Sequence, residues 1–137
     1  MRNVIRQTLV LPATAERLFE MYLDPSTHQA ITGASVEIGD ERGAKFRAFD
    51  GALTGTTLEV VKPRLIIQSW RSNVFKAEDP DSSLILCFTP EDDQGRIDLI
   101  HLDVPDHDYD GVTQGWEKYY WTPWRAYLAS MSNGVAS

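Results

Sequence analysis

The chain has 137 residues, of which 42% are hydrophobic and 24% charged, the composition of a soluble globular domain. This length predicts a single domain over residues 1–131 and a disordered tail over residues 132–137. The net charge of -7 argues against partners such as nucleic acid or anionic membranes, and no apolar run approaches the ~20 residues of a membrane-spanning helix. The single cysteine, Cys87, excludes an intrachain disulfide and indicates a reducing compartment, the cytoplasm.

The N-terminal part of the sequence predicts a strand followed by two short helices. Residues 3–11 nearly alternate apolar and polar side chains, as in a strand with one buried face. Thr14 is a good N-cap for a first helix, and Asp24 followed by Pro25 is a good start for a second helix. Gly33 is expected to end the second helix.

Between residues 35 and 104 the side-chain pattern has a period near two, which predicts strands joined by short turns. Short connections favour an antiparallel meander. The segment Ser72–Ser83 is longer and more polar, and we expect a mobile loop there. Cys87 alternates with apolar neighbours and is expected to be an inert buried thiol. The strands are predicted over Ser35–Ile38, Lys45–Phe49, Leu53–Val61, Leu65–Arg71, Leu84–Thr89 and Ile97–Val104.

Three of the four tryptophans and three of the five tyrosines lie in the run Gly115–Leu128. With about 100° between successive residues, these aromatics form one face of a long C-terminal helix. Trp121 and Leu128 fall outside that face and are expected on its flanks. Pro123 is expected to kink the helix without ending it. The predicted face contains Tyr109, Val112, Trp116, Tyr119, Tyr120, Pro123, Trp124, Tyr127 and Met131.

The order of these elements predicts an α+β fold. A strand, two short helices, about six further strands and one long helix fit a single antiparallel sheet with the long helix on one face. A strongly curved sheet that wraps one helix leaves a hollow between the two layers. The sequence therefore predicts a packed core, a pocket, or both beneath the C-terminal helix.

A set of short motifs occurs in order along the chain: Phe49-Asp50-Gly51, Thr54-Gly55, Leu58-Glu59-Val60-Val61, Ile67-Gln68-Ser69-Trp70-Arg71, Val104-Pro105 and Gly115-Trp116-x-x-Tyr119-Tyr120. The last of these is the strongest. Together the motifs resemble the START-like (SRPBCC) helix-grip superfamily, and within it the homologues of the activator of heat-shock-protein ATPase. The resemblance extends from Ile5 to Leu128, and it implies a seven-stranded antiparallel sheet and an apolar cavity beneath the helix.

The resemblance does not imply one activity. The superfamily uses its cavity for lipids, sterols, polyketides and other hydrophobic ligands, and its members include carriers, cyclases, receptors and a co-chaperone domain. Fold alone therefore does not assign a function. The eukaryotic co-chaperone has an additional N-terminal domain that helps to bind its chaperone, and this sequence has no counterpart of it.

The aromatic face and the resemblance together predict a ligand pocket between sheet and helix. Ordinary core packing is the alternative for each aromatic residue, because buried rings stabilise a core by a few kcal/mol. Gln68 shares the strand parity of Trp70, so it is either a polar group of the pocket or a residue exposed at a sheet edge. The predicted lining is Trp116, Tyr119, Tyr120 and Tyr127 from the helix, with His101, Trp70, Phe88 and Phe46 from the strands.

Two further patterns have structural explanations. Gly111-x-x-x-Gly115 is expected to let the helix backbone pack closely on its neighbours. The acidic and histidine residues around the start of the helix are the residue types of a metal site, but their spacing matches no metal motif, and helix capping and dipole effects explain them. We expect no metal and no cofactor. These residues are Asp103, Asp106, His107, Asp108 and Asp110.

Three functions follow as hypotheses. The first is a cytoplasmic binding module, monomeric or weakly dimeric, that holds a hydrophobic or aromatic small molecule, with the Ser72–Ser83 loop near the mouth of its cavity. The second is a co-chaperone that acts on a heat-shock ATPase in the stress response. The third is a cyclase or hydratase that uses His101, which shares the strand parity of Ile97 and Leu99 and titrates near neutrality when free.

Overall fold

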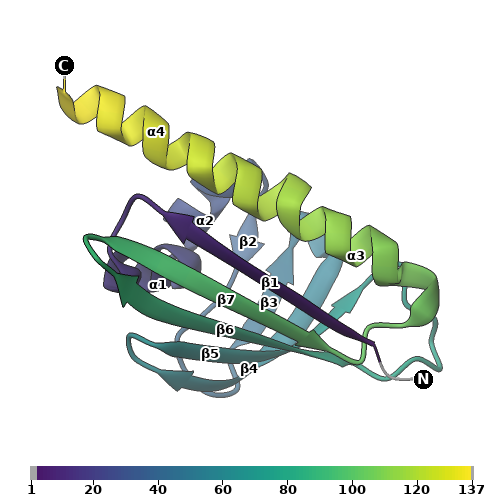
Figure 1. Cartoon of the computed structure of the whole chain (residues 1–137). Coiled ribbons are helices and arrows are strands. Elements are labelled where there is room, and N and C mark those ends of the chain that lie inside the picture. The colour runs from purple at the N-terminus through teal and green to yellow at the C-terminus, as the bar shows by residue number, and fades with distance from the viewer. Residues whose placement is uncertain (1–2, 137) are drawn as a thin grey trace.

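The computed structural model describes residues 3–136, with side chains from Asn3 to Met131. A seven-stranded antiparallel sheet in the order β1-β7-β6-β5-β4-β3-β2 curves around one long C-terminal helix (Figure 1). The predicted α+β helix-grip fold is therefore confirmed. The strands are β1 Val4–Leu11, β2 Val36–Glu37, β3 Lys45–Ala48, β4 Leu53–Val61, β5 Leu65–Ser72, β6 Ser82–Glu91 and β7 Gln94–Leu102.

The two short helices, α1 (Ala15–Leu23) and α2 (Pro25–Thr32), begin at the predicted caps. The hydroxyl of Thr14 accepts a hydrogen bond from the backbone N–H of Arg17 at 3.1 Å. The carboxylate of Asp24 accepts from the N–H of Thr27 at 3.0 Å. Gly33 ends α2 with φ of 80°, the left-handed conformation that glycine adopts without strain.

The inner face of the sheet is formed by alternate residues of the central strands. These side chains face α1 and the C-terminal helix and are at most 4% exposed: Ile66, Gln68 and Trp70 of β5, Leu84, Leu86 and Phe88 of β6, and Ile97, Leu99 and His101 of β7. Of the two alternatives for Gln68, exposure at a sheet edge is wrong, because the side chain is fully buried, and it does not line the pocket described below either. Cys87, expected to be buried, has the opposite parity and is only half-buried, pairing across the sheet with Asp98. Burial, and then the charge of Asp98, raises the pKa of its thiol.

The C-terminal helix is a continuous rod in Figure 1, although its hydrogen-bond pattern changes midway. It consists of α3 (Tyr109–Trp116), one π-helical turn (Glu117–Trp121) and α4 (Thr122–Ala136). In the π turn the N–H of Thr122 bonds the carbonyl of Glu117, five residues back. Pro123 has no N–H for the carbonyl of Tyr119, so an α-helical turn would lose a bond here in any case. The helix continues past Pro123 as expected, and the expected kink is replaced by a π turn.

The π turn shifts the phase of the buried face by one residue. Trp121 and Leu128 were expected on the flanks, but they are 3% and 8% exposed and face the core. Tyr119 was expected to face inward, but it is 48% exposed, and Tyr127 is only partly buried against the core. A helical wheel of constant pitch cannot include this shift, because a π turn holds more residues than an α turn.

The connection from β5 to β6 is held by specific contacts. Phe75 is 8% exposed and its ring lies 6.0 Å from that of Trp70. The guanidinium of Arg71 donates to the carbonyls of Lys76 and Asp79 and pairs with Asp81. The segment expected to be a mobile loop is thus anchored at both its aromatic residue and its turn.

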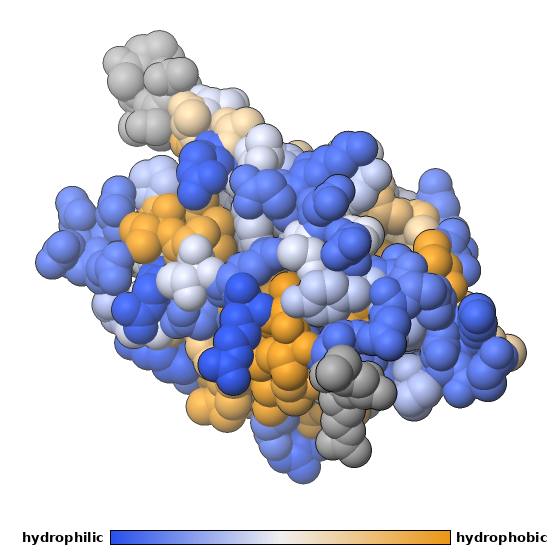
Figure 2. Space-filling view, turned by 45° about the vertical axis from the view of Figure 1, so that its right-hand side comes forward, coloured by the Kyte–Doolittle hydropathy of each residue, from blue (hydrophilic) through white to orange (hydrophobic). Residues whose placement is uncertain are grey.

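The backbone is helical as far as Ala136, and the side chains of the predicted tail, residues 132–137, lie outside the described part of the chain. Among the described residues, no helix combines the length and hydropathy needed to cross a membrane. The face seen in Figure 2 is mostly hydrophilic, with hydrophobic side chains in separate patches.

Candidate functional site

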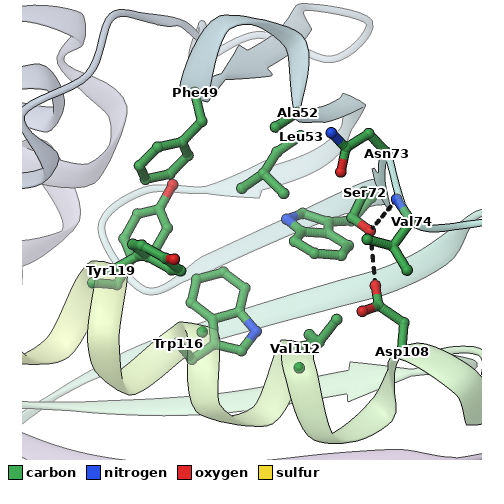
Figure 3. Close-up of a pocket in the computed structure, with 14 residues that line it drawn as sticks. Phe49, Ala52, Leu53, Ser72, Asn73, Val74, Asp108, Val112, Trp116 and Tyr119 are labelled. Carbon is green, nitrogen blue, oxygen red and sulfur yellow. Dashed lines mark hydrogen bonds between the residues drawn. The ribbon is translucent and has the colours of Figure 1, made fainter.

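A pocket of about 440 Å³ lies between the C-terminal helix and the end of the sheet where β4 begins and β5 ends (Figure 3). Val74 and Tyr119 on its rim are 53% and 48% exposed, so the pocket opens to solvent. Most of the lining is apolar. The lining residues are Phe49, Ala52, Leu53, Trp70, Ser72, Asn73, Val74, Asp108, Gly111, Val112, Gly115, Trp116, Tyr119 and Tyr120.

Two glycines of α3 form part of the pocket wall. A Cβ built on Gly115 would have only the ring of Tyr119 within 4 Å outside the local helix backbone, at 3.6 Å. A Cβ on Gly111 would lie 3.0 Å from Oδ1 of Asp108. The expectation that Gly111 and Gly115 bring the helix close to a neighbouring element is therefore wrong. Their missing side chains leave space for the pocket.

Aromatic rings form two sides of the pocket. Trp116 and Tyr120 lie with their ring centroids 4.9 Å apart, and Phe49 meets Tyr119 edge to face at 5.6 Å. Phe49 begins a short 3₁₀ turn, Phe49–Gly51, and has φ of 53°. This left-handed conformation is uncommon for a bulky residue, and such conformations concentrate at functional sites. The turn places the Phe49 ring beside that of Tyr119 at one end of the pocket (Figure 3).

One end of the pocket is polar. Asp108, the residue before α3, is 8% exposed. Its Oδ2 accepts a hydrogen bond from the hydroxyl of Ser72 at 2.7 Å, and the same hydroxyl oxygen accepts from the N–H of Val74 at 3.1 Å. Figure 3 shows these side chains grouped at the end of the pocket away from Phe49 and Tyr119. The site therefore combines an aromatic body with one acidic end.

His101 lies beneath this pocket in a chain of hydrogen bonds. Ser82 donates its hydroxyl proton to the carbonyl of Trp70 at 2.6 Å, so it accepts from Nε2–H of His101 at 2.8 Å. Nδ1 of His101 then accepts from the indole N–H of Trp116 at 3.2 Å. Burial lowers the pKa of His101 to about 3. The imidazole is neutral and both its nitrogens are occupied.

A second buried network lies under α1 and α2. Nδ1 of His28 is 2.8 Å from the carbonyl oxygen of Tyr22, which can only accept, so Nε2 accepts from the hydroxyl of Tyr120 at 2.9 Å. The hydroxyl of Tyr22 donates to Oε1 of Gln68 at 2.7 Å. Burial lowers the pKa of His28 to about 4 and raises those of both tyrosines. This network holds the hydroxyl of Tyr120 and thereby the orientation of its ring. The spacing of these residues in the sequence predicts none of these hydrogen-bond partners.

The predicted lining residues divide into two groups. Trp70, Trp116, Tyr119 and Tyr120 line the pocket, whereas His101, Tyr127, Phe88 and Phe46 do not. Phe88 packs against Phe19 with centroids 5.6 Å apart, and Phe46 lies 6.4 Å from His28. The lining residues that sequence reasoning missed include Phe49 and Leu53, and the Phe49-Asp50-Gly51 motif was the available signal for the first of them. That any of the predicted residues binds a small molecule remains a prediction.

Within the described residues, no group of three or more His, Cys, Asp or Glu side chains is arranged to hold a metal ion. His107 instead pairs with Asp79 at 2.9 Å. Among the acidic residues expected to serve the helix start, Asp108 does not bond the helix backbone with its side chain. It bonds Ser72 across the pocket end instead.

Comparison with known proteins places the chain in a family. The family model described as "Activator of Hsp90 ATPase homolog 1-like protein" matches residues 12–129. Activator of 90 kDa heat shock protein ATPase homolog 1 of Homo sapiens is 26% identical over 107 residues, which are 77% of this chain and 31% of that protein. Homolog 2 of Mus musculus is 27% identical over 113 residues, 82% of this chain and 34% of that protein. The chain thus spans about a third of the length of these relatives.

Solved structures share the fold. The crystal structure of PFC0360w, an HSP90 activator from Plasmodium falciparum, superposes with a TM-score of 0.83 at 21% identity, covering 92% of this chain and 96% of that chain. Ara h 8.0201 superposes with a TM-score of 0.73 at 14% identity, covering 95% and 99%. At these identities the likeness extends to the fold alone. The family match covers most of the sequence, and the chain belongs to the activator of Hsp90 ATPase homolog 1-like family.

Proposed function

We propose that this domain binds a hydrophobic, aromatic small molecule in the pocket between α3, the π turn and the end of the sheet. The observation that carries the proposal is the pair Gly111 and Gly115 on the pocket wall. Glycine inside a helix costs roughly 0.5–1 kcal/mol relative to alanine. Close packing against another element does not explain glycine at these two positions, so we propose that they keep space open for a ligand.

The size and lining of the pocket support the same proposal. Its volume of about 440 Å³ lies in the range of small-molecule sites, roughly 300–1,000 Å³. Aromatic walls with a few polar groups at one end are the usual composition of such sites. Trp116 and Tyr120 are held from behind by His101 and His28, so the walls are preorganised, which lowers the cost of binding.

A binding role is favoured over catalysis by His101. Both ring nitrogens of His101 are engaged by Ser82 and Trp116, and the side chain is fully buried. A general acid or base has to reach the substrate proton directly or through one water. We propose that His101 positions Trp116, and that the domain acts in the cytoplasm without a cofactor.

Filling the pocket from the helix tests the proposal. We expect wild-type protein to bind naphthylethanol, a neutral aromatic probe, and Gly115→Leu to weaken this binding at least about tenfold, because the leucine side chain extends into the pocket. Binding is measured by the change in tryptophan fluorescence, since Trp70 and Trp116 line the pocket.

Gly115→Ala is the matched control. It adds only the Cβ, which makes ordinary van der Waals contact with Tyr119 at 3.6 Å. We expect it to bind the probe and to raise the free energy of unfolding by roughly 0.5–1 kcal/mol. Unchanged probe binding in Gly115→Leu would contradict the proposal that the ligand occupies this pocket.

A co-chaperone role is the second candidate, favoured by the curated relatives. Their names describe activators of the 90 kDa heat-shock-protein ATPase, and the match covers 77% and 82% of this chain. On this alternative the domain would bind a heat-shock chaperone and raise its ATPase rate. An ATPase assay with the chaperone from the same organism separates the two roles: stimulation that persists in Gly115→Leu supports the chaperone role independently of the pocket.

A further inference from the structure

We infer that the ligand of this pocket carries a cationic amine, which binds Asp108 while its aromatic body lies against Trp116 and Tyr119. This inference rests on the proposed small-molecule site and adds the chemical class of its occupant. Of the described residues that line the pocket, Asp108 alone carries a formal charge.

Asp108 differs in its surroundings from the aspartates that form ion pairs. Asp40 pairs with Lys62, Asp81 with Arg71 and Asp98 with Arg96, all on partly exposed surfaces. Asp108 is only 8% exposed, and among the described residues no Lys, Arg or His lies within ion-pair distance of it. A buried carboxylate is costly unless a cation or several hydrogen bonds compensate for it.

The hydrogen bonds of Asp108 leave one oxygen available. Ser72 donates to Oδ2 at 2.7 Å, and no described residue donates to Oδ1. The helix backbone does not use the side chain either, since Asp108 makes no capping bond to α3. Figure 3 shows the second carboxylate oxygen on the side facing Val112 and Trp116.

Gly111 keeps this oxygen accessible. A Cβ at position 111 would lie 3.0 Å from Oδ1, so any larger residue would occupy the approach from the pocket. The missing side chain therefore serves the acidic end as well as the pocket volume. A ligand donor that enters beside Gly111 reaches Oδ1 directly.

The chemistry of the lining favours an ammonium group over a neutral donor. A hydrogen bond between two charged groups is stronger than one between neutral groups, and burial strengthens it further. The aromatic face of Trp116 also attracts cations. The net charge of -7 adds a weaker, long-range attraction. An anion would meet repulsion from Asp108 and no described cation in the lining.

Three probes with the same naphthyl body test the inference: naphthylethylammonium, naphthylethanol and naphthylacetate. We expect wild-type protein to bind the ammonium probe about tenfold more tightly than the alcohol, and the carboxylate probe most weakly. The readout is the ratio of the Kd values of the ammonium and alcohol probes. This ratio in the wild-type protein already tests the inference without any substitution.

Asp108→Asn is the matched substitution, because asparagine keeps an oxygen that accepts from Ser72. We expect the ratio to fall to about one in this variant. Asp110 lies two residues after Asp108, and its side chain is exposed and does not line the pocket. Asp110→Asn therefore removes the same charge outside the pocket, and this variant should keep the wild-type ratio. Circular dichroism and thermal unfolding confirm that both variants are folded.

The outcomes are distinct. A preference for the ammonium probe that disappears only in Asp108→Asn supports the inference. An equal preference in both variants assigns it to net charge and overturns the inference, as does tighter binding of the alcohol or the carboxylate probe. If none of the three probes binds wild-type protein, the small-molecule function itself fails. If only the alcohol probe binds, the small-molecule function is supported, and the inference that the ligand carries a cationic amine is overturned.

Discussion

Trp116→Ala is expected to lower the free energy of unfolding by about 3–5 kcal/mol, the range for removal of a buried tryptophan. The indole is 3% exposed and packs against the rings of Trp70, Tyr120 and Trp121. Its removal also leaves Nδ1 of His101 buried without a donor. Because domains of this size are stable by roughly 5–15 kcal/mol, urea denaturation should show a large decrease in the midpoint.

Trp116→Phe separates ring packing from the hydrogen bond. Phenylalanine keeps an aromatic ring but has no N–H for His101, so we expect a smaller loss of about 1–3 kcal/mol. A loss below about 1 kcal/mol in Trp116→Ala would contradict the placement of this residue in a packed, hydrogen-bonded wall. Equal losses in the two variants would show that the hydrogen bond contributes more than the ring contacts.

The second large effect is a loss of stability in mild acid. Burial lowers the pKa of His28 from 6.5 to about 4 and that of His101 from 6.5 to about 3. The unfolded chain takes up protons on both side chains near pH 6.5, whereas the folded chain does not, so the folded state loses stability as the pH falls. Two groups at about 1.4 kcal/mol per pH unit each give a slope of up to roughly 3 kcal/mol per pH unit between pH ~6 and ~4.

Urea denaturation at a series of pH values measures this slope. Substitution of His101 by Gln should destabilise the protein at neutral pH and reduce the slope by about half, because one of the two groups is removed. His107→Gln is the control, since His107 pairs with Asp79 at the surface. Stability that does not change between neutral pH and pH ~5 would contradict the buried, neutral state of both histidines.

The parts of the fold that depend on local chemistry could be predicted from the sequence. Thr14, Asp24 and Gly33 set helix ends through bonds and backbone angles within a few residues of themselves. The strands follow from alternation, which each strand shows by itself. The order of these elements, with the Gly115-Trp116-x-x-Tyr119-Tyr120 motif, was sufficient for the helix-grip fold.

The phase of the C-terminal helix could not be predicted in the same way. The hydrophobic pattern does not reveal that the helix accommodates Pro123 by a π turn over Glu117–Trp121. Because of that turn, Trp121 faces the core and Tyr119 is exposed, the reverse of what the pattern predicts. Tyr119 nevertheless reaches the pocket rim, because the pocket extends to the surface. A buried helix face that is assigned with a constant 100° per residue is therefore correct only as far as such a π turn.

The pocket itself depends on contacts between distant segments. Phe49, Ser72 and Asp108 are far apart in the sequence and line one pocket only when the sheet curves around α3. The two glycines of α3 were visible in the sequence, but whether they face a neighbouring element or open space depends on the packing. The side chain of His101 faces inward as expected, yet its hydrogen-bond partners Ser82 and Trp116 could not be deduced from the spacing of residues in the sequence.

Nuclear magnetic resonance of the protein saturated with naphthylethanol tests the ligand site most directly. We expect intermolecular nuclear Overhauser effects between the naphthyl protons and the Hα protons of Gly111 and Gly115, since these backbone positions line the pocket. The same effects should be absent in Gly115→Leu. Saturable binding of the probe to wild-type protein without any such effect at either glycine would contradict the claim that α3 is shaped to hold a ligand.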